Sequence, residues 1–358
     1  MEKNPLITLL MIVRKIKLLE RDKAKLISRK NYLRLDKNEK VNNFEKKLLN
    51  KIKITSFDLS AYPETGKIYK YLSNYLKVPK AQLVLVPGSD FGLRICFEYF
   101  CSNKNKKVIT LNPTFGMVEV YSKLYNIKQI KINYNKDFKL NYDELIKNIN
   151  SKISLIILAN PNSPTGTILL KEQMFKIIAK ADKYGVPVLV DEAYYGFYNY
   201  SYINSLRKFK NLLILRTFSK AFGLAGLRAG YLISSKKIIN ELEKFRPMYE
   251  INSLACKFLE IFFKNLVIPE NYIKETAKGK SYFEQELTKL NIIFLKSYAN
   301  FIHINLGKKK KHIEGDLKIK KILTRKGPGV KGFEDFLRIT LGPKKEITKV
   351  LQVLKKYF

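Results

Sequence analysis

Residues 155–166 read Leu-Ile-Ile-Leu-Ala-Asn-Pro-Asn-Ser-Pro-Thr-Gly, an unbroken apolar run followed by a loop with two prolines and a glycine. A short apolar run that ends in turn-forming residues is typical of a strand buried on both faces. Such strands occur in parallel sheets that are covered by helices. The segment therefore predicts an internal strand of an α/β domain, whose carboxyl end opens onto an irregular loop.

The chain on either side repeats this pattern from about residue 83 to residue 235. Helical stretches such as Tyr142 to Ile149 and Lys171 to Tyr184 separate short β-branched runs. Strands that alternate with helices predict a mostly parallel sheet in a three-layer α/β domain. The runs predicted to be strands are Val108 to Leu111, Ile127 to Ile132, Leu155 to Leu158, Val186 to Val190, Leu212 to Leu215 and Gly230 to Ile233.

The pattern changes after Lys236, where one long helical region is predicted to about Asn265 and further helix to about Leu290. Two strand-like segments and a last helix follow, which predicts a smaller α+β domain. The lysine run 308–311 is interpreted as a loop. The two strand-like segments are Asn300 to Leu306 and Phe336 to Leu341.

Three parts are therefore expected. Residues 1–55 would form an N-terminal helix or arm that belongs with the small domain, residues 56–239 the large domain and residues 240–358 the small domain. The longest early apolar run, Leu6 to Val13, is far too short to cross a membrane and is interpreted as part of an amphipathic helix.

The chain has 358 residues and a formal net charge of +37, which is unevenly distributed. Residues 1–30 hold nine basic and three acidic residues, and residues 301–331 hold ten and two, whereas residues 159–193 hold four of each. A basic surface attracts anionic small molecules and binds polyanions without specificity. Because no nucleic-acid-binding motif is visible, specific nucleic-acid binding is not expected. A basic polyanion-binding protein stays open as a non-enzymatic alternative.

Histidine and cysteine usage excludes further classes. Only His303 and His312 occur, which disfavours triad hydrolases and zinc enzymes, and no metal site is expected. The three cysteines, Cys96, Cys101 and Cys256, lack the CxxC spacing and are interpreted as small buried apolar groups. This usage is typical of a reducing compartment and favours a cytoplasmic location.

Residues able to do chemistry follow three of the predicted strands. Ligands of such sheets bind beyond the carboxyl ends of the strands. The loop 159–166 follows one strand, Asp191 follows a second, and the segment Arg216-Thr-Phe-Ser-Lys220 follows a third and leads to Arg228. Singly, these residues could be a helix cap, a solvated lysine and a surface arginine. Together, a desolvated lysine and a buried acid suit pyridoxal phosphate, whose ring nitrogen needs an acidic partner.

Two groups of residues are suited to an anion. Thr217, Ser219 and Arg228 offer hydroxyl donors and a guanidinium fork, which match a phosphate group. The segment Val86-Pro-Gly-Ser-Asp-Phe-Gly92 predicts a turn that opens onto a helix, whose free amides also bind phosphate. A glycine-rich turn alone is weak support, because plain turns share this composition.

The series of motifs resembles the fold-type I pyridoxal-phosphate aminotransferases, and within them the histidinol-phosphate aminotransferase branch. The resemblance covers roughly residues 34–345, and many motifs in one order make chance an unlikely account. The motifs are Asp36-Lys-Asn-Glu39, Tyr62-Pro63, Gly88-Ser-Asp90, Asn112-Pro-Thr-Phe115, Asn160-Pro-Asn-Ser-Pro-Thr-Gly166, Asp191-Glu-Ala-Tyr194, the segment from Arg216 to Arg228, and Leu337-Arg-Ile-Thr-Leu-Gly342.

This resemblance implies catalytic roles for three residues and cofactor contacts for others. Lys220 would bind pyridoxal 5'-phosphate as a Schiff base and act as the general base. Asp191 would keep the ring nitrogen protonated, and Tyr194 would hydrogen-bond the phenolic oxygen. The cofactor phosphate would be bound by Thr217, Ser219, Arg228, the amides of Ser89 and Asp90, and Tyr62 from the other subunit of a homodimer.

The same resemblance implies a substrate site and shows two departures from the family. Asn38, Arg325 and Arg338 would bind the substrate, the two arginines at its anionic end. Ser163 stands where the family usually has an asparagine that contacts the phenolic oxygen. Phe115 stands where the branch usually stacks a tyrosine on the cofactor ring, which a phenylalanine can also do.

The hypothesis is therefore a transaminase that works by ping-pong chemistry. It would move an amino group, with glutamate as the expected donor, to a small anionic carbonyl acceptor, either phosphorylated or not. A pyridoxal-phosphate-dependent amino-acid phosphate decarboxylase on the same scaffold is the enzymatic alternative.

Overall fold

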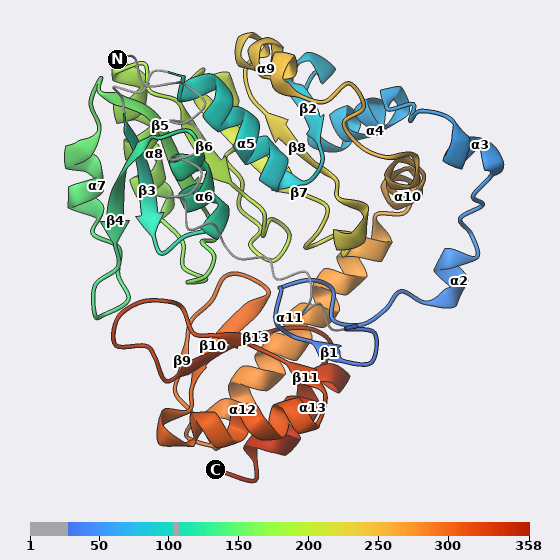
Figure 1. The fold of residues 1–358 in the computed structure, drawn as a ribbon, viewed down its shortest axis with the longest axis vertical. Coiled ribbons are helices and arrows are strands. Elements are labelled where there is room, and N and C mark those ends of the chain that lie inside the picture. The colour runs from blue at the N-terminus through green and yellow to red at the C-terminus, as the bar shows by residue number, and fades with distance from the viewer. Residues whose placement is uncertain (1–27, 103–106) are drawn as a thin grey trace, which may run out of the picture.

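The computed structural model describes residues 28–102 and 107–358, which build a larger and a smaller part around two sheets (Figure 1). The predicted helix around Leu6 to Val13 lies outside the described residues. The larger sheet has seven strands, and only β8 runs antiparallel to its neighbours. In spatial order the strands are β2 (Leu83–Val86), β8 (Gly230–Ile233), β7 (Leu212–Thr217), β6 (Val188–Asp191), β5 (Ile153–Ala159), β3 (Lys107–Asn112) and β4 (Lys128–Asn133).

Side chains of this sheet alternate between two apolar cores, one on each face. On β5, Ile156 and Leu158 belong to one core, and Leu155 and Ile157 to the other. Because every residue of β5 is buried, the strand reads as a continuous apolar run. The first core includes α4 (Gly66–Leu76), α7 (Tyr142–Asn148), α8 (Lys171–Lys183) and α10 (Ser253–Lys264); the second includes α5 (Ser89–Phe100), α6 (Gly116–Leu124) and α9 (Lys236–Leu242).

The smaller part is an antiparallel sheet packed on helices. One face of this sheet, with Ile302 and Leu337 among others, joins a third core. The opposite face holds Phe301, whose ring lies 5.6 Å from that of Tyr194 in the larger part. The strands in order are β12 (Arg325–Lys326), β13 (Phe336–Thr340), β10 (Phe301–Asn305) and β9 (Phe294–Leu295), and the helices are α11 (Val267–Lys289), α12 (Lys310–Ile319) and α13 (Lys344–Leu354).

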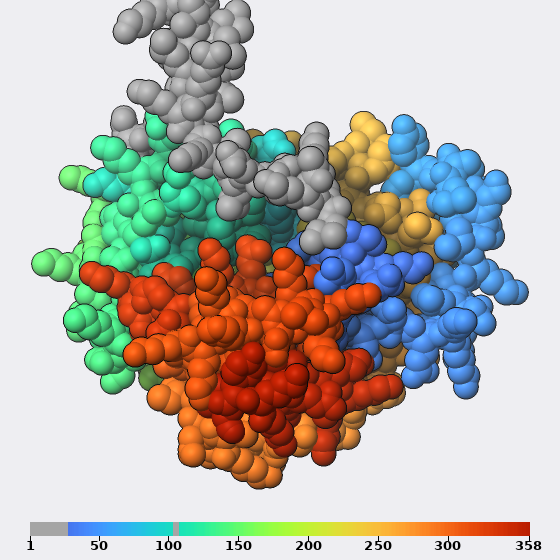
Figure 2. Space-filling view, turned by 60° about the horizontal axis from the view of Figure 1, so that its bottom comes forward, coloured from blue at the N-terminus to red at the C-terminus, as the bar shows by residue number. Residues whose placement is uncertain are grey.

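The N-terminal segment crosses from one part to the other. Strand β1 (Leu33–Arg34) pairs with β11 (Ile322–Leu323) of the smaller part, and the chain then continues through α2 (Lys46–Leu49) and α3 (Ser56–Ser60). Figure 2 shows the dark blue residues of this segment against the orange and red C-terminal part, and the light blue residues projecting at the side. Phe57 and Leu59 of α3 are 63% and 71% exposed.

All six predicted strands of the larger sheet are present, and so are the two strand-like segments of the smaller part. Two predictions in the C-terminal half were wrong. The helical region after Lys236 is interrupted at residues 246–252 because Pro247 cannot continue a helix. The lysine run forms a 3₁₀ turn, η6 (Gly307–Lys309), and the start of α12, since lysine is a good helix former.

The predicted domain boundaries stay predictions. Ala255, Leu259 and Phe262 of α10 belong to the core of the larger sheet, whereas Phe283 and Leu287 of α11 belong to that of the smaller part. We therefore propose that the two parts join between α10 and α11. Of the cysteines, Cys96 and Cys101 are buried as predicted, but Cys256 is only partly buried.

Candidate active site

Three strand ends meet at the carboxyl edge of the larger sheet. Asp191, at the end of β6, pairs in register with Ala159 on one side and with Leu215 on the other. Two residues beyond Leu215, β7 ends at Thr217, and Lys220 follows in the next turn. The register of the strands therefore places the acid and the lysine at one edge of the sheet.

The reversed strand β8 adds an arginine to the same edge. Its first residue, Gly230, pairs with Thr217 of β7 and with Val86 of β2. Arg228 lies two residues before β8, so it is adjacent to the turn after β7 and to the turn that opens α5. The two predicted anion-binding segments thus lie side by side.

These segments form a cradle of donors. The Thr217 hydroxyl donates to Ser219 Oγ at 3.0 Å, and Arg228 Nη1 lies 3.5 Å from the same oxygen. Gly88 precedes α5 with φ 83°, and a Cβ built on it would lie 2.7 Å from Arg228 Nη2. The amides of Ser89 and Asp90 open the helix, where N–H groups have no acceptor within the helix. The cradle is suited to a phosphate.

Lys220 is half-buried and has only a backbone acceptor. Its Nζ donates to the carbonyl oxygen of Lys37 at 2.9 Å and lies 6.0 Å from the centre of the Tyr194 ring. Burial, together with the positive charge of Arg338, lowers the pKa of Lys220 to about 8. A lysine with such a pKa has an appreciable neutral, nucleophilic fraction near neutrality.

Asp191 is held in the same way, by a backbone group alone. Its Oδ1 accepts the amide of Ala193 at 2.9 Å. Burial raises the pKa of Asp191 to about 7, and the nearby charge of Lys220 acts against this increase. Among the ion pairs of the described residues, none involves Asp191 or Lys220. The carboxyl group thus lies in a desolvated place that an additional cationic N–H would stabilise.

Tyr194 links the two parts of the molecule. Its hydroxyl accepts the side-chain amide of Asn38 at 2.9 Å. Asn38 in turn bonds to Thr340 of β13, both through its backbone N–H and through its Oδ1. Burial raises the pKa of Tyr194, and hydrogen bonding by Ser163 opposes this increase. The predicted residues Asn38, Ser163 and Tyr194 therefore lie together.

Arg338 and Arg325 are neighbours on the smaller sheet. They pair in register across β13 and β12, so their side chains share one face. Arg338 is 8% exposed, and its Nη2 donates to the carbonyl oxygen of Asp36 at 2.7 Å. Burial lowers the pKa of Arg338, and the charge of Arg325 adds to this effect. Two adjacent guanidinium groups favour an anion between them.

Two predicted residues lie at the surface. Tyr62 is 72% exposed and stacks on Tyr249, with ring centres 4.0 Å apart. Phe115 is 41% exposed and follows a loop in which Thr114 donates to Asn162. Among the described residues, neither Tyr62 nor Phe115 has a hydrogen bond or ring interaction with Lys220.

Sequence reasoning gave no role to several residues that support the site. Arg216 and Glu192 form a buried ion pair with a distance of 2.8 Å, and Ser201 completes the cluster through hydrogen bonds. Although burial acts to lower it, Glu192 and Tyr231 raise the pKa of Arg216. Asn300 donates to the carbonyl oxygen of Asn38. Arg216 and Glu192 lie inside the quoted motifs and Asn300 starts a predicted strand, whereas Ser201 had no such signal.

The residues present fit the expected cofactor. A phosphate suits the cradle at Arg228, and a pyridine N–H suits the isolated carboxyl group of Asp191. The Lys220 amine lies at the same edge of the sheet and is suited to a covalent bond with an aldehyde. Tyr194 and Ser163 offer hydroxyl groups for a phenolic oxygen.

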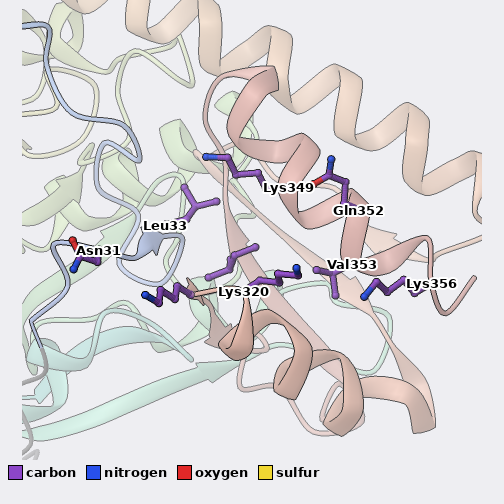
Figure 3. A pocket seen from close by; sticks show the side chains of 9 residues that line it. Asn31, Leu33, Lys320, Lys349, Gln352, Val353 and Lys356 are labelled. Atoms are coloured by element: carbon purple, nitrogen blue, oxygen red, sulfur yellow. The ribbon is translucent and has the colours of Figure 1, made fainter.

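A separate cleft of about 450 Å³ lies on the smaller part, between β1, β11 and α13 (Figure 3). Its lining includes Lys320, Lys321, Lys349 and Lys356, and it contains no carboxylate. Because the cleft offers no acid and no buried nucleophile, we do not assign the catalytic chemistry to it.

Within residues 28–102 and 107–358, no helix is long and apolar enough to cross a membrane, and no cluster of potential metal ligands occurs.

Comparisons with known proteins give one family. The family model for aminotransferase class I and II matches residues 59–354. The histidinol-phosphate aminotransferase of Clostridium novyi (strain NT) is 32% identical, over 90% of this chain and 91% of that protein. Histidinol-phosphate aminotransferase 1 of Carboxydothermus hydrogenoformans is 35% identical, over 90% and 92%. The structure of the histidinol-phosphate aminotransferase of Sinorhizobium meliloti in complex with pyridoxal-5'-phosphate has a TM-score of 0.80 at 20% identity, over 91% and 92%.

The raised pKa of Asp191 predicts a pH-dependent effect on stability. A carboxyl group whose pKa is about 7 in the folded state and about 4 when unfolded destabilises the fold as pH rises through that interval. Asp191→Asn removes this cost. Without cofactor, the variant should have a higher free energy of unfolding than the wild type, by on the order of 2 kcal/mol at pH 8 and by much less at pH 5. The value at pH 8 is reduced to allow for the partial exposure of Asp191.

Urea unfolding at the two pH values measures this difference. Asp182→Asn, at an exposed aspartate of α8, is the matched control and should show a far smaller change between pH 5 and pH 8. A difference for Asp191→Asn that is independent of pH would contradict the prediction.

The close approach of Gly88 to Arg228 predicts a loss of cofactor affinity in Gly88→Ala. The new methyl group would displace the guanidinium group, and the positive φ is unfavourable for alanine. We expect the dissociation constant for pyridoxal phosphate, measured by absorbance titration, to rise about tenfold or more. Gly185→Ala, also at positive φ but with nothing within 4 Å, is the control and should bind like the wild type. Equal affinities would contradict the predicted cradle.

Proposed function

The chain belongs to the class I and II aminotransferases, and from this premise we propose that it transfers an amino group between glutamate and a small phosphorylated carbonyl compound. The protein is a pyridoxal-phosphate-dependent transaminase. The adjacent arginines Arg325 and Arg338, with no carboxylate pairing to them among the described residues, are the observation that supports an anionic substrate.

We propose that the cofactor is held by the edge of the larger sheet. Arg228, Thr217, Ser219 and the amides of Ser89 and Asp90 would bind its phosphate, as the cradle geometry favours. Asp191 would accept a hydrogen bond from the ring nitrogen and keep it protonated. Tyr194 and Ser163 would contact the phenolic oxygen, and Phe115 would stack on the ring. Lys220 would bind the cofactor through its amine. When bound, pyridoxal phosphate supplies an electron sink for the carbon next to the substrate nitrogen.

Lys220 would also move the proton. At pH 7 a group with a pKa of about 8 is neutral in about one tenth of molecules, enough to accept a proton at Nζ. Its backbone acceptor, the carbonyl oxygen of Lys37, leaves the charge of the amine uncompensated. Arg338 would bind the carboxylate of glutamate or the phosphate of the acceptor, with Arg325 and Asn38 beside it.

A homodimer would complete the site. Tyr62 is exposed and stacked on Tyr249, it lines a surface pocket together with Phe57, and further exposed apolar residues lie near these three in the sequence. An exposed cluster of this kind is typical of a protein interface. We propose that Tyr62 contributes to the phosphate site of the other subunit. The further exposed apolar residues near them in the sequence are Leu49, Ile54, Leu59 and Met248.

The enzymatic alternative, decarboxylation of an amino-acid phosphate, is less well supported, because the two relatives described above, at 32% and 35% identity, are aminotransferases by name. The cofactor site described above likewise disfavours a protein that only binds polyanions. A cytoplasmic location, proposed from the free cysteines, is consistent with a metabolic enzyme.

The acceptor can be identified by activity. With glutamate as donor, we expect turnover with imidazole-acetol phosphate and at most weak turnover with unphosphorylated keto acids, because a phosphate dianion matches two arginines best. Formation of 2-oxoglutarate measures transamination, and release of carbon dioxide measures the alternative. Lys220→Ala should abolish turnover, whereas Lys349→Ala in the separate cleft should not. Turnover restricted to unphosphorylated keto acids would overturn the proposed substrate.

The position of Tyr62 can be tested by mixing subunits. Lys220→Ala and Tyr62→Ala homodimers should both have low activity. If Tyr62 acts in the neighbouring site, the mixed dimer has one site with both defects and one intact site. Activity should then rise on mixing, toward half of the wild-type value per mixed dimer. No rise, with mixed dimers present by mass spectrometry, would place Tyr62 in its own subunit's site or outside both.

A further inference from the structure

His303 is a buried histidine that the reaction described above does not use. It lies on β10 with 0% exposure, and its Nε2 is 2.7 Å from the carbonyl oxygen of Pro164. A carbonyl oxygen can only accept, so Nε2 carries the proton. Burial lowers the pKa of His303 to about 4, so the ring is neutral at physiological pH. Nδ1 is therefore a lone-pair acceptor, and it has no partner among the described residues.

His303 is the next member of the row that contains the two arginines. In the smaller sheet Arg325 pairs with Arg338, and Arg338 pairs with His303. Cross-strand partners project from the same face with Cβ atoms about 5 Å apart. Both side chains also contact Phe301: the His303 ring lies 5.6 Å from its centre and the Arg338 guanidinium carbon 5.2 Å.

The two neighbours have complementary unpaired atoms. Arg338 uses Nη2 for the carbonyl oxygen of Asp36, but its Nε is buried without a partner. His303 lacks a donor for Nδ1. A buried donor and a buried acceptor without partners are costly, and these two belong to residues paired across adjacent strands.

We propose that His303 is a positioning residue for Arg338, whose Nε–H it accepts at Nδ1 when the guanidinium group binds the anionic end of the substrate. This inference rests on the proposed substrate role of Arg338. A neutral acceptor fits that role better than a carboxylate, since it orients the guanidinium group without neutralising its charge. Through Nε2, His303 also fixes this orientation relative to Pro164, next to Ser163.

Two substitutions of His303 distinguish the acceptor role of Nδ1 from the donor role of Nε2. Asparagine places an acceptor oxygen near the position of Nδ1 but does not reach Pro164, whereas glutamine places a donor near Nε2 and leaves no acceptor near Nδ1. The probe is succinate, an unreactive dicarboxylate, measured as a competitive inhibitor of the holoenzyme with glutamate as substrate. Melting temperature and cofactor absorbance confirm that each variant is folded and loaded.

We expect His303→Gln and His303→Leu to raise the Ki for succinate and the KM for glutamate about tenfold, with a smaller change in kcat. His303→Asn should keep most of the succinate affinity and lose thermal stability instead. Equal succinate affinity in His303→Gln and the wild type, or a greater loss in His303→Asn than in His303→Gln, would overturn the proposal.

Arg338→Ala distinguishes this proposal from the proposed function. If Arg338→Ala greatly weakens succinate binding and His303→Gln does not, only the role of His303 fails. If Arg338→Ala leaves the Ki for succinate unchanged, the proposed substrate site fails, and the role of His303 fails with it.

Discussion

The reversed direction of β8 is the constraint on which the site depends. In a purely parallel sheet, the residues before a strand lie at the opposite edge from those that follow its neighbours. Because β8 runs against β7 and β2, Arg228 instead reaches the edge at which Thr217 and the start of α5 lie. The backbones approach so closely that a Cβ on Gly230 would lie 2.7 Å from the Ser89 nitrogen and 2.8 Å from the Arg216 oxygen. The phosphate cradle is thus a consequence of topology as much as of side chains.

Neighbouring residues at this edge have opposite electrostatic roles. Glu192 accepts Arg216, Ser201 and the amide of Tyr202, so its buried charge is fully compensated. Asp191, one residue earlier, has one backbone donor, and burial raises its pKa instead. A buried charge without a partner is costly, and such groups are concentrated where a ligand supplies the missing partner. The ion pair of Glu192 and Arg216 thus fixes the ends of β6 and β7, and the end of β6 also carries the carboxyl group of Asp191, which has no charged partner in the part of the chain that the structure describes.

Most of the larger sheet was predictable because its strands are short apolar runs that end in turn residues, as at residues 155–166. The candidate residues Asp191, Lys220 and Arg228 were predictable as followers of those runs. The direction of β8 was not predictable, since all four of its residues are buried and burial alone does not indicate the direction of a strand. The break at residues 246–252 and the start of α12 were predicted wrongly, although each has a local signal: Pro247 ends a helix, and lysine favours one. His303 and Asn300 matter only through partners far away in sequence, which composition and spacing do not reveal.

The segment 36–38 explains how the positive groups are oriented while their charge stays available. The carbonyl oxygen of Asp36 accepts Arg338, that of Lys37 accepts Lys220, and the side chain of Asn38 donates to Tyr194. Each partner is neutral, so none competes with an anion as a carboxylate would. Asn38 is itself fixed by Thr340, which belongs to the smaller sheet. Since one three-residue segment contacts the lysine, the tyrosine and the arginine, a shift of the smaller part would move all three contacts together, and their geometry is preorganised as a unit.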